Sequence, residues 1–261
     1  MVAVAESFSD RLDRAIISTG SMLCLGLDPD AADAAGAERQ CHDLLDATLD
    51  DVCAVKPNLA FFEQHGSAGY AVLERIRDAV PGDRMLILDG KRGDIGNTAT
   101  AYARALFDVL GADAITVNAL MGRDSVAPFL DRPGRGVFVL ARTSNPGAAD
   151  FLDHPEAAPL YTRIVDIAGG WDPGGGAIGY VVGATSPRAI AEVRRRAPRA
   201  PLLLPGVGAQ GGSLEAAVAA ALDLHGRGAV LPVSRGISAA PGGPAAAARS
   251  LRDRIAAVRA G

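Results

Sequence analysis

Short apolar runs recur along the chain, and each is followed by small or polar residues and then by a helical pattern. The runs are apolar at successive positions, which is typical of parallel strands that are covered on both faces. The segments between them repeat apolar residues with the period of an amphipathic helix. Eight runs are present, at 23–28, 53–58, 85–91, 114–118, 136–142, 178–184, 201–207 and 229–236.

Eight strand–helix units predict an α/β protein with a closed (β/α)8 barrel, the TIM-barrel fold. Two further helical patterns, at 8–19 and 244–259, are expected to flank the barrel at the N- and C-terminal ends. The 261 residues, 49% of them hydrophobic, suffice for one large core. No shift in composition marks a boundary, so we expect residues 1–261 to form a single catalytic barrel domain.

Charge and composition exclude several classes of function. The net charge is -4 and the pI is about 5.6, and no concentrated basic face points to a nucleic-acid partner. The one basic cluster, Arg194–Arg196, falls in a helical pattern and is expected to be a solvated helix face. The N-terminus lacks the pattern of a signal peptide, and no apolar run approaches the ~20 residues of a membrane span. We therefore expect a cytoplasmic protein without a membrane partner.

The cysteines and histidines do not predict a metal site. Cys24, Cys41 and Cys53 are odd in number and lack CxxC spacing, so we expect reduced and mostly buried thiols. The four histidines are scattered, without HxxxH or HxH pairs, and a zinc site built from histidine is not expected. Trp171, in the glycine-rich stretch 169–176, has no assigned role.

Charged residues follow the first three predicted strands. In a (β/α)8 barrel the chemistry lies at the C-terminal ends of the strands. Asp28 ends the first run, Lys56 lies in the second, and Asp89 and Lys91 end the third, with Asp94 just beyond. Asp89 and Lys91 are two positions apart, so on a strand they face the same side, and there they would approach Lys56.

Such an Asp–Lys cluster has two interpretations. It could be an ion network that closes the top of the barrel and adds little net stability. It could also be a catalytic cluster in which aspartates and lysines keep each other ionised. Its position at the catalytic end favours the second interpretation. Asp28 itself could serve either in an Asx turn or in contact with a sugar hydroxyl.

The last strands predict a phosphate site. The seventh run is followed by the glycine-rich GVGAQGGS, which contains Gln210 and could also act as a lid. The eighth run ends in SRGIS, where Arg235 could clamp an anion beside open backbone N–H groups. Barrels often bind phosphate between these two loops. After the fifth run, Thr143 and Ser144 are either turn residues or donors to a polar ring, whereas Glu63 is interpreted as a helix-start residue.

These motifs resemble those of a known family. The stretch DGKRGDIGNT, residues 89–98, is similar to the D-x-K-x-x-D signature of orotidine 5'-phosphate decarboxylases. GLDPD, VKPNLAFFE, ARTSNPG, VVGATSP, PGVGAQGG and VSRGIS match the companion motifs, so the resemblance runs from about residue 23 to about residue 238. The TSNPG and PGVGAQGG versions are similar to the longer bacterial branch of that family.

The resemblance implies a reaction without a cofactor or metal, in which orotidine 5'-monophosphate loses CO2 to give uridine 5'-monophosphate in pyrimidine biosynthesis. It implies that Lys91 donates a proton to C6 of the pyrimidine and that Asp89 lies against the substrate carboxylate. Lys56 and Asp94 would complete an alternating Lys–Asp array. The family's second aspartate, here Asp94, and the threonine that follows it, here Thr98, reach in from the partner subunit, so a homodimer is implied.

The resemblance also implies how the nucleotide is bound. Asp28 would bind the ribose, with Lys56 and Thr98 nearby, and Ser144 would bind the base. The phosphate would be held by Gln210, Arg235 and the backbone of Gly236.

Three other functions are compatible with parts of the pattern. Related barrels use D-x-K-x-x-D with Mg²⁺ on keto-sugar phosphates, but Lys56 would place a cation where a metal site needs carboxylates. A Schiff-base aldolase needs a neutral lysine, whereas neighbouring aspartates stabilise the charged form. A non-catalytic nucleotide-binding barrel would not need the full charged cluster.

Overall fold

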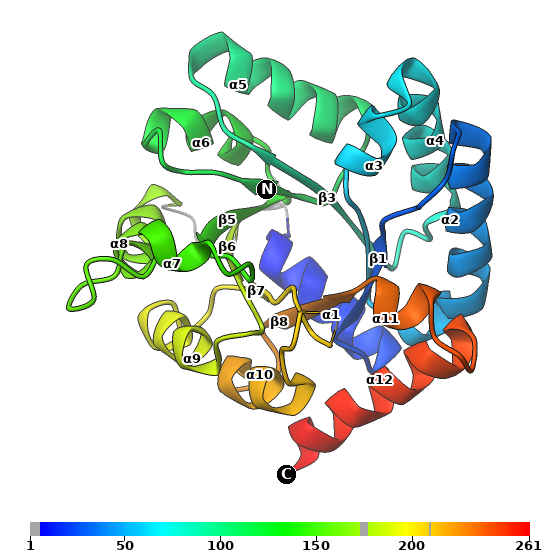
Figure 1. The fold of residues 1–261 in the computed structure, drawn as a ribbon. Coiled ribbons are helices and arrows are strands. Elements are labelled where there is room, and N and C mark those ends of the chain that lie inside the picture. Colours follow the sequence, from blue (N-terminus) through cyan, green and yellow to red (C-terminus); the bar gives the residue numbers. More distant parts are fainter. Residues whose placement is uncertain (1–5, 173–176, 209) are drawn as a thin grey trace, which may run out of the picture.

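The computed structural model describes residues 6–172, 177–208 and 210–261, and its strands form one closed barrel (Figure 1). Every strand pairs in parallel with its neighbour in chain order, and β8 pairs with β1 to close the ring. The strands are β1 (Leu23–Leu27), β2 (Ala54–Pro57), β3 (Met85–Arg92), β4 (Ala114–Val117), β5 (Gly136–Arg142), β6 (Ile178–Val182), β7 (Leu202–Leu203) and β8 (Ala229–Val233). The predicted (β/α)8 barrel is confirmed.

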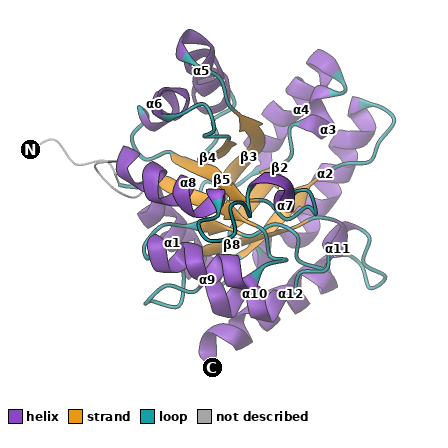
Figure 2. Cartoon of the chain, turned by 60° about the vertical axis from the view of Figure 1, so that its left-hand side comes forward, coloured by secondary structure: helices purple, strands orange, loops and turns teal. Residues whose placement is uncertain are grey.

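The helices form a layer outside the strands (Figure 2). They are α1 (Phe8–Thr19), α2 (Ala34–Thr48), α3 (Ala60–Glu63), α4 (Gly66–Ala79), α5 (Gly96–Ala103), α6 (Arg123–Leu130), α7 (Ala148–Phe151), α8 (Leu160–Ala168), α9 (Pro187–Arg196), α10 (Leu214–Ala221), α11 (Arg235–Ser238) and α12 (Pro244–Ala260). Short turns of other helix types follow α2 (η1, Leu49–Asp51), α5 (η2, Arg104–Val109) and α8 (η3, Gly169–Trp171). The two flanking helices, α1 and α12, lie where their patterns predict them.

The last two strands are shorter than their apolar runs predict. The seventh run was expected over 201–207, but β7 ends at Leu203. Pro205 has no N–H for a strand ladder, and Gly206 has φ of 100°, so the backbone turns away from the sheet there. The eighth run was expected to 236, but β8 ends at Val233 and its polar end becomes helix α11. The predicted lid segment includes Ala209, which lies outside the described residues.

Helix α1 closes the N-terminal end of the barrel. Ser7 caps it by accepting a hydrogen bond from the backbone N–H of Asp10, and Gly20 ends it in the left-handed conformation. The ring of Phe8 packs edge-on against Phe138 of β5, with ring centroids 5.7 Å apart. A Cβ on Gly136 would lie 2.4 Å from the Phe8 ring, so this position must be glycine for the helix to seat.

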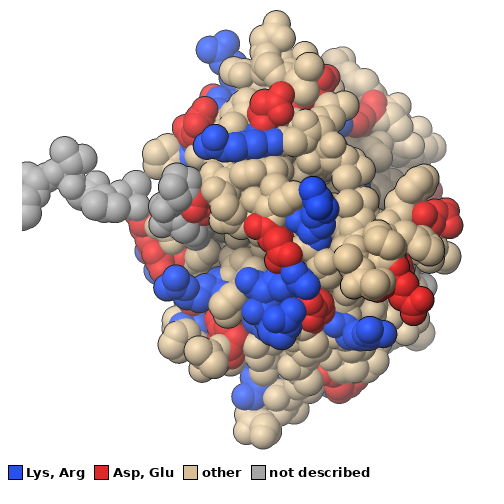
Figure 3. All heavy atoms as spheres, turned by 90° about the vertical axis from the view of Figure 1, so that its left-hand side faces the viewer, with Lys and Arg blue, Asp and Glu red and all other residues tan. Residues whose placement is uncertain are grey.

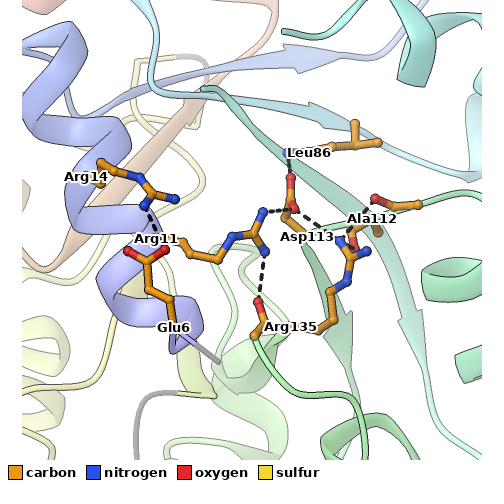
Figure 4. Close-up of polar contacts among 9 residues, drawn as sticks. Glu6, Arg11, Arg14, Leu86, Ala112, Asp113 and Arg135 are labelled. Carbon is orange, nitrogen blue, oxygen red and sulfur yellow. Dashed lines mark hydrogen bonds and ion pairs between the residues drawn. The ribbon is translucent and has the colours of Figure 1, made fainter. Parts of the chain in front are cut away.

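A partly buried ion cluster stabilises the same end of the barrel (Figure 4). The carboxylate of Asp113 accepts hydrogen bonds from Arg11 of α1 and, at 3.1 Å, from Arg135. Its second oxygen accepts the backbone N–H of Leu86 at 2.9 Å. Arg11 also donates to the backbone oxygen of Gly134 at 2.9 Å. One carboxylate thus joins α1, the start of β3 and the loop before β5.

The basic cluster at the end of α9 is not wholly a solvated face, so that prediction is wrong for one residue. Arg194 is only 9% exposed, and its guanidinium donates to backbone carbonyls, including those of Ala221 and Gly228. Burial lowers its pKa to about 10. Arg195 and Arg196 do pair with Glu192 at the surface. On the face shown in Figure 3, basic and acidic side chains are interspersed.

The three cysteines belong to the hydrophobic core. All three cysteines are free and buried, as expected. Burial raises the pKa of Cys41 and of Cys53 to about 12, so both thiols stay protonated at neutral pH. Within the described residues, no helix has the length and apolar character that crossing a bilayer requires.

Asp113→Ala is expected to lower the free energy of unfolding by about 3 kcal/mol, because it leaves three partly buried donors without their acceptor. The exposed ion pair of Asp108 with Arg132 provides a matched control, and Asp108→Ala should cost less than about 1 kcal/mol. Urea denaturation of both variants measures the difference. Equal losses of unfolding free energy in the two variants would show that the Asp113 cluster does not stabilise the barrel.

Candidate active site

The C-terminal ends of the strands enclose a cavity of about 390 Å³, a volume within the range of small-molecule sites. The strands of a parallel barrel all end at this face, so side chains far apart in sequence meet there. Most of the residues predicted for the site line this cavity: Asp28, Lys56, Asp89, Lys91, Ser144, Gln210, Arg235 and Gly236.

The carboxylate of Asp89 lies at the centre of the charged cluster. Its Oδ2 accepts a hydrogen bond from Lys56 Nζ at 2.9 Å, and its Oδ1 accepts one from Lys91 Nζ at 2.8 Å. Oδ1 also accepts the hydroxyl of Thr116 at 2.9 Å. The side chains of Lys56 and Asp89 are largely buried, whereas that of Lys91 is half-exposed and faces the cavity.

This arrangement keeps the buried pair ionised. Burial alone would raise the pKa of Asp89, but the charges of Lys56 and Lys91 together hold it well below its ordinary value. Burial would likewise lower the pKa of Lys56, but the charges of Asp89 and Asp28 outweigh this and raise it. Both shifts favour the charged forms, so an anion lies between two cations at neutral pH.

Strand β3 reaches this geometry through an irregularity rather than as the regular strand that was predicted. Its register against β4 shifts between Leu88 and Arg92. Lys91 has φ of 46°, in the left-handed region. The backbone therefore turns at Lys91, and both charged side chains of the motif face the cavity, as a bulge can achieve by redirecting a side chain.

Asp28 faces the cavity with one oxygen free. The hydroxyl of Ser234 donates to its Oδ2 at 2.5 Å. Its Oδ1 is buried and has no hydrogen-bond partner among the described residues. A buried carboxylate oxygen without a donor is costly, so this atom is suited to accept a hydrogen bond from a ligand hydroxyl.

Ser144 and Gln210 approach each other across a glycine-lined part of the wall. A Cβ on Gly183 would lie 2.6 Å from the Ser144 backbone, and a Cβ on Gly206 would lie 2.7 Å from Gln210 Oε1. The two glycines therefore allow the loops after β5, β6 and β7 to come together. Arg235, the first residue of α11, is exposed at the mouth of the cavity.

Two predicted residues do not line the cavity of this chain. Asp94 is partly buried, and its Oδ1 accepts the backbone N–H of Ile95 at 2.8 Å. Thr98 is exposed on α5. In Figure 1 this helix stands at the outer edge of the barrel. The structure therefore brings neither side chain to the Asp89 cluster.

Several site residues were missed from the sequence. Thr116, Asn58 and Ser234 also line the cavity. Thr116 lies in the fourth apolar run, two positions before its end, and a polar side chain there was the available signal. Ser234 lies within the SRGIS motif but was not singled out.

Glu63 does not have the helix-start role that the sequence predicted. It ends α3 rather than starting a helix, and its Oε1 accepts hydrogen bonds from Arg92 and, at 3.1 Å, from Tyr70. The guanidinium of Arg92 also lies over the ring of Tyr102, 5.1 Å from its centroid. Arg92 thus connects the end of β3 to α3 and α5. Trp171 packs against the core and does not line the cavity.

The fold and cavity define the class: a (β/α)8-barrel enzyme with an acid–base cluster at the C-terminal mouth. Residues 21–251 match the family described as Orotidine 5'-phosphate decarboxylase / HUMPS family. The orotidine 5'-phosphate decarboxylase of Roseiflexus castenholzii is 47% identical, over 97% of this chain and 99% of that protein. The one from Thermomicrobium roseum is 45% identical, over 97% and 96%.

Solved structures agree with the sequence relatives. The structure of Leishmania donovani OMP decarboxylase superposes with a TM-score of 0.91 at 43% identity and covers 98% of this chain and 100% of that one. The chain belongs to the orotidine 5'-phosphate decarboxylase / HUMPS family. The two relatives named above are bacterial, and the resemblance noted in the sequence is confirmed.

Lys56→Met is expected to destabilise the fold by about 3 kcal/mol at pH 7, because Asp89 keeps its burial but loses a cation. The depressed pKa of Asp89 contributes stability above the unfolded pKa of about 3.9, and this contribution is lost as the pH falls toward the folded pKa. In the variant the pKa is less depressed, so less stability is lost on acidification. The contribution of Lys56, whose pKa is raised, is constant over this acidic range.

The difference between wild type and Lys56→Met should therefore shrink from about pH 5 to about pH 3. Urea denaturation at several pH values measures it. A difference that stays constant down to pH 3 would contradict the proposed coupling between Lys56 and Asp89.

Proposed function

We propose that this chain is a single catalytic domain that decarboxylates orotidine 5'-monophosphate to uridine 5'-monophosphate and CO2 without a cofactor. The observation that carries the proposal is the Asp89 carboxylate held between Lys56 and Lys91 inside the cavity. The names of the relatives, which are decarboxylases of this substrate, support the same reaction.

Decarboxylation at C6 requires a nearby cation that can also donate a proton, and the cluster contains one in Lys91. When the bond from C6 to the carboxylate breaks, its electron pair remains on C6 in the plane of the ring, where the π system delocalises it poorly. The ammonium of Lys91 stabilises that charge and then transfers a proton from Nζ to C6. The neutral lysine regains a proton from water. Asp89, placed beside the departing carboxylate, repels it in the ground state, and this repulsion ends when CO2 leaves.

The rest of the nucleotide supplies binding energy away from C6. We assign the ribose to Asp28, whose free Oδ1 faces the cavity, with Lys56 nearby. Ser144 binds the base. The phosphate is assigned to Gln210, Arg235 and the backbone of Gly236, at the two loops where barrels bind phosphate. Binding energy from the phosphate lowers the barrier when it orders the site around the reacting carbon.

A homodimer completes the proposed site. Asp94 and Thr98 do not line this chain's cavity, which supports a role for them in the site of a partner subunit. Exposed apolar side chains accompany them: Ile95 is 53% exposed, and Leu120 and Met121 are 61% and 58% exposed. Gly93 packs against Asn118, so these two loops adjoin. Apolar surface of this kind favours a protein interface. Three free, buried cysteines support a cytoplasmic location.

The rival chemistries fit this geometry less well. A Mg²⁺-dependent enzyme would use the motif's carboxylates as ligands, but both oxygens of Asp89 already accept hydrogen bonds from Lys56, Lys91 and Thr116. A Schiff-base aldolase needs a neutral lysine, whereas the aspartates raise the pKa of Lys56. A non-catalytic binding barrel would have no use for a buried anion between two cations.

The wild-type protein is expected to convert orotidine 5'-monophosphate to uridine 5'-monophosphate at a rate that EDTA does not change, and Lys91→Ala is expected to reduce turnover by at least about 10⁴-fold. Ultraviolet absorbance follows the loss of substrate. Arg188→Ala, a change at an exposed position outside the cavity, serves as the control. Turnover that requires Mg²⁺ would contradict the cofactor-free reaction and indicate a metal-dependent enzyme. Retained turnover in Lys91→Ala would remove the proton-donor role.

Asp94→Ala and Lys91→Ala should each be inactive alone but should recover partial activity when unfolded together and refolded as a mixture. The reason is that a mixed dimer contains one site with both native residues if Asp94 crosses the interface. Random pairing puts about half of the subunits in such dimers, so roughly a quarter of the wild-type activity is expected. Absence of recovery, with mixed dimers verified by mass spectrometry, would place Asp94 in its own subunit's site.

A further inference from the structure

Lys91 is held in an unfavourable backbone conformation. With φ of 46°, it is the one non-glycine residue with positive φ in the described part of the chain. Such a conformation persists only when the surrounding structure determines it, and it is concentrated at functional sites. The backbone N–H of Lys91 is hydrogen-bonded to Thr116 of β4, and its side chain is hydrogen-bonded to Asp89.

The side chain of Thr116 accepts a backbone hydrogen bond where the ladder between β3 and β4 is interrupted. In the β3–β4 pairing, Leu88 is opposite Ile115 and Arg92 is opposite Val117, so the stretch between them is opposite Thr116 alone. A bulge of this kind leaves backbone groups without a ladder partner. The N–H of Lys91 donates instead to the side-chain Oγ1 of Thr116 at 2.9 Å.

The same hydroxyl also contacts the catalytic carboxylate. Thr116 Oγ1 donates to Asp89 Oδ1 at 2.9 Å, and Lys91 Nζ donates to that oxygen at 2.8 Å. A hydroxyl has one proton, so accepting from Lys91 while donating to Asp89 determines its orientation. The backbone of Lys91, Thr116, Asp89 and the ammonium of Lys91 therefore form a closed ring of hydrogen bonds. Thr116 is 1% exposed, so water does not compete for these bonds.

We propose that Thr116 is a positioning residue that sets where the Lys91 ammonium stands relative to the reacting carbon. This inference rests on the proposed function of Lys91. Thr116 would act through Lys91 and Asp89, by holding the turn of β3 and the carboxylate in one geometry. Proton transfer and charge stabilisation depend on such placement, and a displacement of about 1 Å can cost about 100-fold in rate.

Three variants separate positioning from stability. Thr116→Val keeps the shape and the branched Cβ but removes both hydrogen bonds, whereas Thr116→Ser keeps the hydroxyl. Thr48→Val is the matched control: Thr48 is also 1% exposed and donates to a backbone carbonyl, that of Leu44, at 2.8 Å, but it lies in α2 outside the cavity. For each variant, kcat and KM for orotidine 5'-monophosphate, the Kd of uridine 5'-monophosphate and the Tm are measured.

We expect Thr116→Val to lower kcat by about 100-fold while KM and the product Kd change less than about threefold, since the phosphate and ribose contacts remain. Thr116→Ser should recover kcat to within about fivefold of the wild type, because a serine hydroxyl has the same donor and acceptor capacity. Thr48→Val should lower the Tm but leave kcat unchanged. Thr116→Val with kcat within threefold of the wild type, or with kcat no lower than that of Thr48→Val, would overturn the proposal.

Two measurements distinguish a failure of the Thr116 role from a failure of the proposed function. If the wild type does not turn over the substrate, or if Lys91→Ala does, the proposed function fails whatever Thr116→Val shows. If Thr116→Val does not fold, hydrogen exchange of the Lys91 amide is measured by NMR in the wild type and in Thr116→Ser. We expect slow exchange in both, because the acceptor is buried; a Lys91 amide that exchanges as fast as an exposed loop amide would overturn the inference.

Discussion

The carboxylate of Asp89 is the group on which the organisation of this cavity depends. This carboxylate is largely buried, so its charged form would be unfavourable without partners. Its partners are Lys56 from β2, Lys91 from the end of its own strand and Thr116 from β4. Each partner is in place because β2, β3 and β4 are paired neighbours in the barrel. Buried ion pairs add little to net stability, and breaking one by removing a partner is costly. A cluster of this kind is therefore best explained by what it does to a substrate, and only secondarily by what it does for the fold.

The N-terminal end of the barrel is closed by packing and ion pairs, whereas the C-terminal end holds the cavity. At the N-terminal end, α1 is held by the Phe8–Phe138 contact and by the hydrogen bonds of Asp113 with Arg11 and Arg135. At the C-terminal end, Asp28 has a buried oxygen that finds no donor in the described part of the chain, and Arg235 is exposed at the cavity mouth. A buried carboxylate oxygen without a donor costs stability, so Asp28 marks a surface that a ligand can complete. Strand geometry follows the same division: the pairing of β3 with β4 is regular near Asp113 and irregular near Lys91.

The proposed reaction asks for a proton donor that is both charged and correctly placed. Asp89 holds the ammonium of Lys91 by a hydrogen bond, and the irregular turn of β3 positions it. Arg92, next to Lys91, is held by Glu63 of α3 and lies over Tyr102 of α5. The turn that carries Lys91 is thus connected to the segment that carries Asp94 and Thr98, which we assign to the partner's site. In a dimer of this design, the geometry of one site and the contact between subunits would depend on the same short stretch of chain.

The sequence by itself determined the eight strands, the helices between them and the end of the barrel at which Asp28, Lys56, Asp89 and Lys91 meet. It could do so because strand and helix periodicity are local, and because parallel strands place their C-terminal ends together. Only the tertiary structure decided that β7 is two residues long, that Arg194 is buried, and that Thr116 and Ser234 hold Asp89 and Asp28. The Thr116 contact with Lys91 joins residues 25 positions apart, and the Ser234 contact with Asp28 joins residues 206 apart. No local pattern encodes such pairings, because they depend on the register at which the barrel closes.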